Sequence, residues 1–238
     1  MDEDVTDVEV IKADLMFATD IFKSYDPALI DNAEWQQMTE WLRTVFGGEL
    51  PGDYSNVKSL EEWLQRLMEA ELNIMTSSGT SGQYSFVPRD MNTRMGLMMN
   101  SALVFQPFFG KVLENISDYD AAILNFSSGS AGVQAASNSI GNIVQTAHYL
   151  YDMHMPADAV RVLQRGPKND VEKKFIEEFE RVMTTEKDLR YEVMLNNIRK
   201  SLENGKKILM QGACYQLKEL CLKAVEQGGV SLPEGSVL

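Results

Sequence analysis

The sequence predicts an α/β protein in which a helical N-terminal lead is followed by a mostly parallel sheet flanked by helices. Amphipathic segments with helical spacing dominate the first 72 residues, and compact apolar runs typical of strands follow later. From residue 121 onward, strand-like, turn-like and helix-like segments alternate, as in strand–helix–strand units with parallel strands. We therefore divide the chain into a helical region, 1–72, and an α/β region, 73–238.

The helical region has recognisable start and stop signals. A helix is expected from about Val8, where the apolar residues first follow helical spacing. A second helix is expected over 35–46, closed by Gly47-Gly48. A third is expected to begin after Ser59, a good N-cap residue followed by two glutamates, and to run to about Leu72.

The α/β region is read from short apolar runs between turn residues. The expected strands are a hairpin strand over 84–88 ended by Pro88, a buried strand over 121–126, and strands over 159–163 and 207–211. The expected helices are 91–114 with Asp90 as N-cap, a helix after the 127–132 loop running to about Tyr151, then 170–185, 188–203 and 215–226.

Charge and composition exclude several function classes. The chain has 22 basic and 35 acidic residues among 238, a net charge of −13. That charge opposes binding to nucleic-acid phosphates or to anionic lipid. The acidic N-terminus is unlike a secretory signal, and two cysteines fit a reducing compartment. The most apolar stretch, 95–109, is too short and too polar to span a bilayer. We expect a cytoplasmic protein with no membrane span and no nucleic-acid partner.

The segment 76–82 carries the most chemical information. It places five hydroxyl residues and two glycines in seven positions. Such a loop suits phosphate binding, because glycines let the backbone bend while amide and hydroxyl donors converge on the anion. A flexible Ser/Gly turn is the plain alternative. The segment is neither a Walker A loop, since no lysine follows Gly82, nor a G-x-S-x-G nucleophile elbow.

Ser77-Ser78-Gly79-Thr80-Ser81-Gly82 resembles the [ST]-S-G-[ST]-[ST]-G phosphate loop of adenylate-forming enzymes, the superfamily of acyl-CoA synthetases. The context is most similar to the branch of LuxE acyl-protein synthetases and phenylacetate–CoA ligases. In that branch a strand-like apolar pair precedes the loop, here Ile74-Met75, and a hairpin strand follows it. The passages 207–212 and 232–238 resemble the strand–helix–LPxGS passage of the same branch.

The resemblance implies an ATP-dependent ligase that activates a carboxylic acid as an acyl-adenylate with Mg²⁺. The acyl group then passes to a thiol acceptor, such as CoA or the cysteine of a carrier protein. It implies phosphate contacts from Ser77, Ser78, Gly79, Thr80, Ser81 and Gly82, and an acyl pocket near Gly212 and Tyr215. The loop 127–132 corresponds to the region that forms the acyl pocket or its entrance, although an ordinary strand-to-helix turn also explains it.

The sequence departs from the family pattern at two points. The family loop continues to a lysine, whose position here is Ser85, and Arg89 is the candidate substitute for that cation. The adenine-binding strand, the magnesium motif and the catalytic lysine of the family would follow Leu238. We therefore expect an N-terminal portion of a ligase that is inactive alone. Two alternatives stay open: a binding module for a nucleotide, an acyl ligand or a protein, and a structural domain whose loop binds nothing.

Three weaker patterns have plain structural explanations. His148, Asp152 and His154 are close in sequence, but on the expected helix they do not share one face, so a structural or surface role is favoured over a metal site. Cys214 and Cys221 are expected to be core thiols that cannot bridge each other. The apolar stripe of the 91–114 helix fits core packing at least as well as an acyl tunnel; it comprises Met91, Met95, Met98, Met99, Phe105, Phe108 and Phe109.

Overall fold

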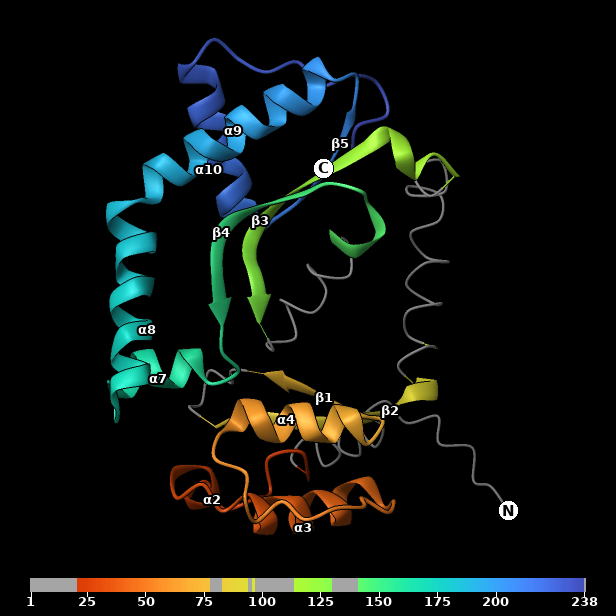
Figure 1. Ribbon diagram of the computed structural model, residues 1–238, viewed down its shortest axis with the longest axis vertical. Coiled ribbons are helices and arrows are strands. Elements are labelled where there is room, and N and C mark those ends of the chain that lie inside the picture. Colours follow the sequence, from red (N-terminus) through yellow and green to blue (C-terminus); the bar gives the residue numbers. More distant parts are fainter. Residues whose placement is uncertain (1–20, 78–82, 94–95, 97–113, 130–140, 238) are drawn as a thin grey trace, which may run out of the picture. The chain divides into compact units, whose positions relative to one another are not determined.

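The computed structural model describes residues 21–77, 83–93, 96, 114–129 and 141–237. The chain divides into two compact units, Met1–Leu97 and Met98–Leu238. Both units are drawn in Figure 1. The elements are mixed, with helices, an antiparallel strand pair in the first unit and a parallel sheet in the second.

The described part of the first unit includes the helices α2 (Ala28–Asp31), α3 (Trp35–Phe46) and α4 (Leu60–Glu69) and the hairpin strands β1 (Leu72–Ser77) and β2 (Ser85–Asp90). The bounds of α3 are those expected from the sequence. Gly47 ends the helix in the left-handed conformation, with φ of 68°, and its N–H bonds the carbonyl of Arg43. The next helix stops at Glu69, earlier than expected, because Leu72 already belongs to β1.

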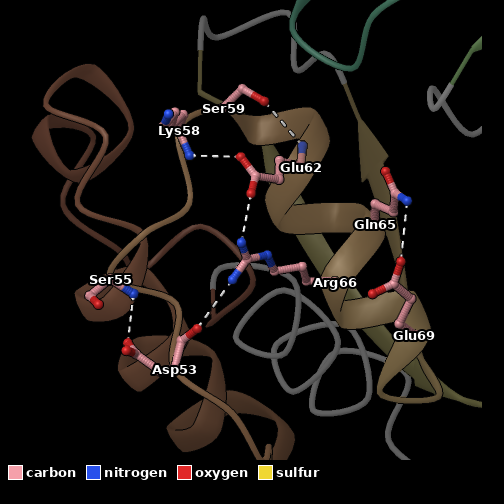
Figure 2. A network of polar contacts seen from close by, with 8 residues as sticks. All are labelled: Asp53, Ser55, Lys58, Ser59, Glu62, Gln65, Arg66 and Glu69. Carbon is pink, nitrogen blue, oxygen red and sulfur yellow. Dashed lines mark hydrogen bonds and ion pairs between the residues drawn. The ribbon is translucent and has the colours of Figure 1, made fainter.

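The start of α4 is held by a polar network (Figure 2). The Ser59 hydroxyl accepts the backbone N–H of Glu62 at 3.1 Å, which confirms Ser59 as the N-cap. The Glu62 carboxylate in turn accepts the N–H of Lys58 at 3.0 Å and pairs with Arg66 at 2.8 Å. Arg66 also donates to the carbonyl of Asp53, so the loop before α4 is attached to the helix itself.

An aromatic cluster forms the core of the first unit. Trp63 is fully buried, stacks on Trp35 at a centroid distance of 5.8 Å and meets the ring of Phe86 edge-on at 5.5 Å. The indole N–H of Trp63 donates to the buried hydroxyl of Thr39 at 2.8 Å. Because Phe86 belongs to β2, this cluster fixes the hairpin against the helices.

The second unit is built on a parallel sheet, as expected from the sequence, and its strand order is β4-β3-β5. Its strands are β3 (Tyr119–Gly129), β4 (Ala147–Met155) and β5 (Lys207–Gln211). Val237 extends the sheet beyond β5, because its N–H and C=O bond Ile208 and Met210 in a parallel bridge. The central strand β3 is buried from Tyr119 to Leu124.

Helices flank this sheet: α7 (Ala159–Arg165), α8 (Asp170–Glu180), α9 (Lys187–Glu203) and α10 (Cys214–Glu226), with a π-helical turn over Arg181–Thr185 and a 3₁₀ turn over Ile116–Asp118. Helix α9 contacts all three strands, and α10 packs on α9 (Figure 1). The shared core joins Met194, Leu195 and Ile198 of α9 to Leu124 and Leu150 of the sheet. Among the described residues, no helix combines the length and apolarity that crossing a bilayer demands.

Two expectations for the second unit are wrong. The segment expected to be helical up to Tyr151 ends in the strand β4, whose side chains Leu150, Tyr151 and Met153 are buried beside β3. Conversely, the expected strand 159–163 is the helix α7, which ends at Gly166. A run of four or five apolar residues fits either type of element, and pairing with β3 decides between them.

Smaller corrections concern element ends. Pro88 does not end β2 but pairs with Ile74 inside it, which a two-stranded sheet permits because each strand has an unpaired edge. Residues 127–129 of the expected loop are the end of β3. The expected helix 170–185 becomes π-helical after Glu180.

The next expected helix is only partly described. Asp90 accepts the N–H of Thr93 at 2.6 Å, as expected of an N-cap. Met91 is exposed. The rest of the apolar stripe, from Met95 to Phe109, lies outside the described residues.

Candidate functional site

The hairpin β1–β2 carries the Ser/Thr/Gly motif between its strands. The strands are antiparallel, and their last paired residues before the loop are Ser77 and Ser85. Residues directly opposite in such a pair have Cα atoms about 4.5–5.5 Å apart, so the ladder holds both ends of the connection together. The positions 78–82, which include five of the six expected phosphate contacts, lie outside the described residues.

The residues that lead from the motif into β2 are hydrogen-bonded to the segment before α2. Gln83 donates to the carbonyl of Lys23 at 2.8 Å, and the Tyr25 hydroxyl donates to the carbonyl of Tyr84 at 3.0 Å. The backbone N–H of Phe86 bonds the carbonyl of Phe22 at 3.0 Å. These bonds, with the burial of Tyr84 and Phe86, fix the second strand of the hairpin rigidly.

Arg89 is poorly placed to replace the family's lysine. It lies opposite Asn73 in the ladder, whereas Ser85, four residues earlier on β2, lies opposite Ser77 beside the motif. At about 3.3 Å per residue, the two positions are separated by roughly 13 Å along the strand. The backbone of Arg89 therefore lies near the opposite end of β2 from Ser85, the position that corresponds to the family's lysine.

The carboxyl ends of β3 and β4 place a second group of polar side chains together. Ser127 donates to the Asp152 carboxylate at 3.2 Å, and the Ser128 hydroxyl lies 3.1 Å from Nδ1 of His154. The two serines are half-buried, and Asp152 and His154 are exposed. In parallel sheets this end of the strands is where ligands bind.

His148 and His154 lie at opposite ends of the strand β4, where the sequence predicts a helix up to about Tyr151. His148 is near the amino end of β4 and His154 near its carboxyl end, a separation of about 20 Å. His148 lies 3.5 Å from the buried hydroxyl of Ser201 and close to the buried carboxylate of Asp120. Burial lowers the pKa of His148, which Asp120 raises and Lys200 lowers. In the described part of the chain, no three His, Cys, Asp or Glu side chains gather as a metal site would require.

Gly212 and Tyr215 follow the carboxyl end of β5. A Cβ added at Gly212 would lie 2.7 Å from Cβ of Leu124, so close packing of the turn on β3 by itself requires glycine. Tyr215 is 65% exposed in the first turn of α10. Burial raises the pKa of Tyr151, and the nearby Tyr215 raises it further. Tyr215 therefore lies on the surface, beside the buried ring of Tyr151.

The cysteines are not core thiols as expected. Cys214 begins α10 and Cys221 lies two turns later, and both are exposed and unbridged. Leu220, the neighbour of Cys221, is the residue of this turn that is buried against the core. The spacing of seven residues indicated one helical face correctly, but that face is turned to solvent.

Sequence reasoning found the loop that begins at Ser127 but did not pair its serines with Asp152 and His154. A period of two over 147–155 was the available signal, since it predicts a strand that would end beside Ser128.

Comparison of the chain with family models, with curated proteins and with solved structures finds no match in any of the three.

Proposed function

We propose that this chain is the phosphate-holding portion of an ATP-dependent ligase that activates a carboxylic acid as an acyl-adenylate. The observation that carries the proposal is the hairpin: a loop of hydroxyl residues and glycines joins two paired strands, and the second strand is anchored in an aromatic core. Donors presented from a fixed base can stabilise the charge on a leaving pyrophosphate without reorganising.

The residues assigned to the phosphates are Ser77, Ser78, Gly79, Thr80, Ser81 and Gly82, with Thr80 as the favoured hydroxyl. The ligands of the parent enzyme are ATP, Mg²⁺ and a carboxylic acid, and a thiol such as CoA or a protein cysteine accepts the acyl group. Gly212 and Tyr215 remain candidates for the acyl pocket.

A binding module without turnover is the second candidate. It is favoured by the position of Ser85, where the family has its lysine, and by the distance of Arg89 from the loop. Without that cation, hydroxyl and amide donors alone would hold the anion, and affinity for phosphate would be weak. The strength of binding therefore distinguishes the candidates.

Calorimetric titration with Mg·ATP, and separately with pyrophosphate, tests the proposal. Both ligands should release or absorb heat with the wild-type chain, and a Thr80→Ala, Ser81→Ala double variant should lose that signal. A Thr44→Ala, Ser117→Ala variant removes two exposed hydroxyls elsewhere and should bind normally. Absence of heat with the wild-type chain would refute phosphate binding by the loop.

A further inference from the structure

The group at the carboxyl ends of β3 and β4 has the composition of a reactive site. Two hydroxyls, a carboxylate and an imidazole lie together, in the pairs Ser127–Asp152 and Ser128–His154. The distance of 3.1 Å between the Ser128 hydroxyl and the imidazole is within the reach of a nucleophile and its base. Nδ1 accepts the hydroxyl proton when Nε2 carries the ring's own proton.

A register change in the sheet brings these side chains together. Consecutive side chains of a regular strand point to opposite faces, so Ser127 and Ser128 would normally be on different sides. The pairing of β3 with β4 shifts twice, between Ile123 and Phe126 and again between Phe126 and Ser128. Ser127 lies within the second shift and Ser128 directly after it, and the two serines bond residues of β4 that are two positions apart and share one face. Such irregularities commonly re-aim side chains beside active sites.

We propose that Ser128 is a nucleophile that accepts an acyl group from an activated acyl donor, with His154 as its general base. The donor class is an ester, thioester or acyl phosphate with a good leaving group. The exposure of His154 leaves the pair open to such a substrate. Ser127 is not the nucleophile, because its hydroxyl is held by the Asp152 carboxylate, a weaker base than imidazole.

The proposed step is balanced within the pair and its substrate. The Ser128 oxygen bonds the carbonyl carbon of the donor while its proton moves to Nδ1 of His154. The bond from that carbon to the leaving group then breaks, and the leaving group takes the proton from the imidazolium. Water attack on the acyl-serine ester, with the imidazole again as base, releases the carboxylic acid and regenerates the hydroxyl.

This inference does not depend on the phosphate loop, because the donor is already activated when it reaches Ser128. An ATP titration that shows no heat would refute phosphate binding by the loop and would not contradict the proposed reaction of Ser128. In the same way, an unreactive Ser128 would leave phosphate binding untouched. Each proposal can therefore be refuted without affecting the other.

The test uses the full chain and a fluorophosphonate, which labels activated serines irreversibly, with peptide mass spectrometry to locate the label. We expect one label, on Ser128. Ser128→Ala should abolish it and the matched control Ser127→Ala should retain it. His154→Gln should slow labelling by about a hundredfold, the usual contribution of a general base. The wild-type rate should also rise with pH, and the His154→Gln rate should stay level.

Three results would overturn the proposal. They are an unlabelled wild-type chain, a label that persists in Ser128→Ala, and a His154→Gln variant that reacts as fast as the wild type. Circular dichroism of each variant separates loss of reactivity from loss of fold. If Ser128→Ala is misfolded, hydrolysis of p-nitrophenyl acetate by the wild type and by His154→Gln decides, since the proposal requires the wild type to be much faster.

Discussion

At the scale of single residues, Gly212 shows how packing and function compete as explanations. The sequence resemblance assigns it to an acyl pocket, and the structure shows a steric reason for glycine at the same position. We expect Gly212→Ala to lower the free energy of unfolding by about 1–3 kcal/mol, because the added methyl overlaps Leu124. Urea denaturation followed by circular dichroism measures this. Gly96→Ala adds the same methyl at a helical position where no described atom lies within 4 Å, and it should not lower the free energy of unfolding.

His148 is expected to make stability depend on pH. Burial lowers its pKa in the folded chain below the usual value near 6.5, so the unfolded chain takes up the proton first. The free energy of unfolding should therefore fall as the pH drops below about 6.5 and should reach a new plateau below the folded pKa. Thermal melts between pH 7 and pH 5 measure the effect. His148→Gln should melt with less pH dependence in this window, and an unchanged slope would contradict the assignment.

At the scale of elements, one ion pair joins α7 to α8. Arg165 bonds both oxygens of Glu172 at 2.8 and 2.9 Å, and Glu172 also accepts the N–H of Lys168 at 2.7 Å. These bonds lower the pKa of Glu172 to about 2. A lowered carboxyl pKa stabilises the folded chain above the unfolded value of about 4.5, and the benefit disappears as the pH falls towards 2.

We therefore expect Glu172→Gln to be less stable than the wild type at pH 7 by about 1–3 kcal/mol. The difference should shrink between pH 4.5 and pH 2, where the wild-type carboxylate takes up its proton. Urea midpoints across that range measure it. Glu203→Gln, which changes an exposed carboxylate near the end of α9, is the control. A difference that is independent of pH would contradict the ion-pair explanation.

Elements with clear end signals could be predicted from the sequence, and the strand β5 was also located, at 207–211. Helix α3 has an amphipathic stripe and a glycine stop, and α4 has the Ser59 cap, so both were located closely. Strand β4 was misread because the helix expected after the 127–132 loop was extended to about Tyr151, across a segment whose own period of two indicates a strand. The Ser128–His154 pair depends on two register shifts in the pairing of β3 with β4, and no local pattern of residue types predicts such shifts.

At the scale of the whole molecule, the net charge of −13 is the dominant electrostatic fact. Self-repulsion at low ionic strength destabilises a compact state, and salt shortens the screening length from about 30 Å at 0.01 M to about 8 Å at 0.15 M. The melting temperature should therefore rise by a few degrees over this range of sodium chloride. The exposed ion pairs oppose the trend only weakly, since each contributes less than about 1 kcal/mol. A melting temperature that falls with salt would show that ion pairs outweigh the repulsion.

The aromatic core of the first unit has a consequence for spectroscopy. All three tryptophans of the chain, Trp35, Trp41 and Trp63, belong to that unit, and Trp63 touches the Phe86 ring beneath the hairpin. Indole fluorescence is thus an intrinsic, label-free reporter of the part that carries the Ser/Thr/Gly loop. The second unit contains no tryptophan and therefore gives no indole emission. A Tyr215→Trp substitution at its exposed surface would give it an emission signal of its own.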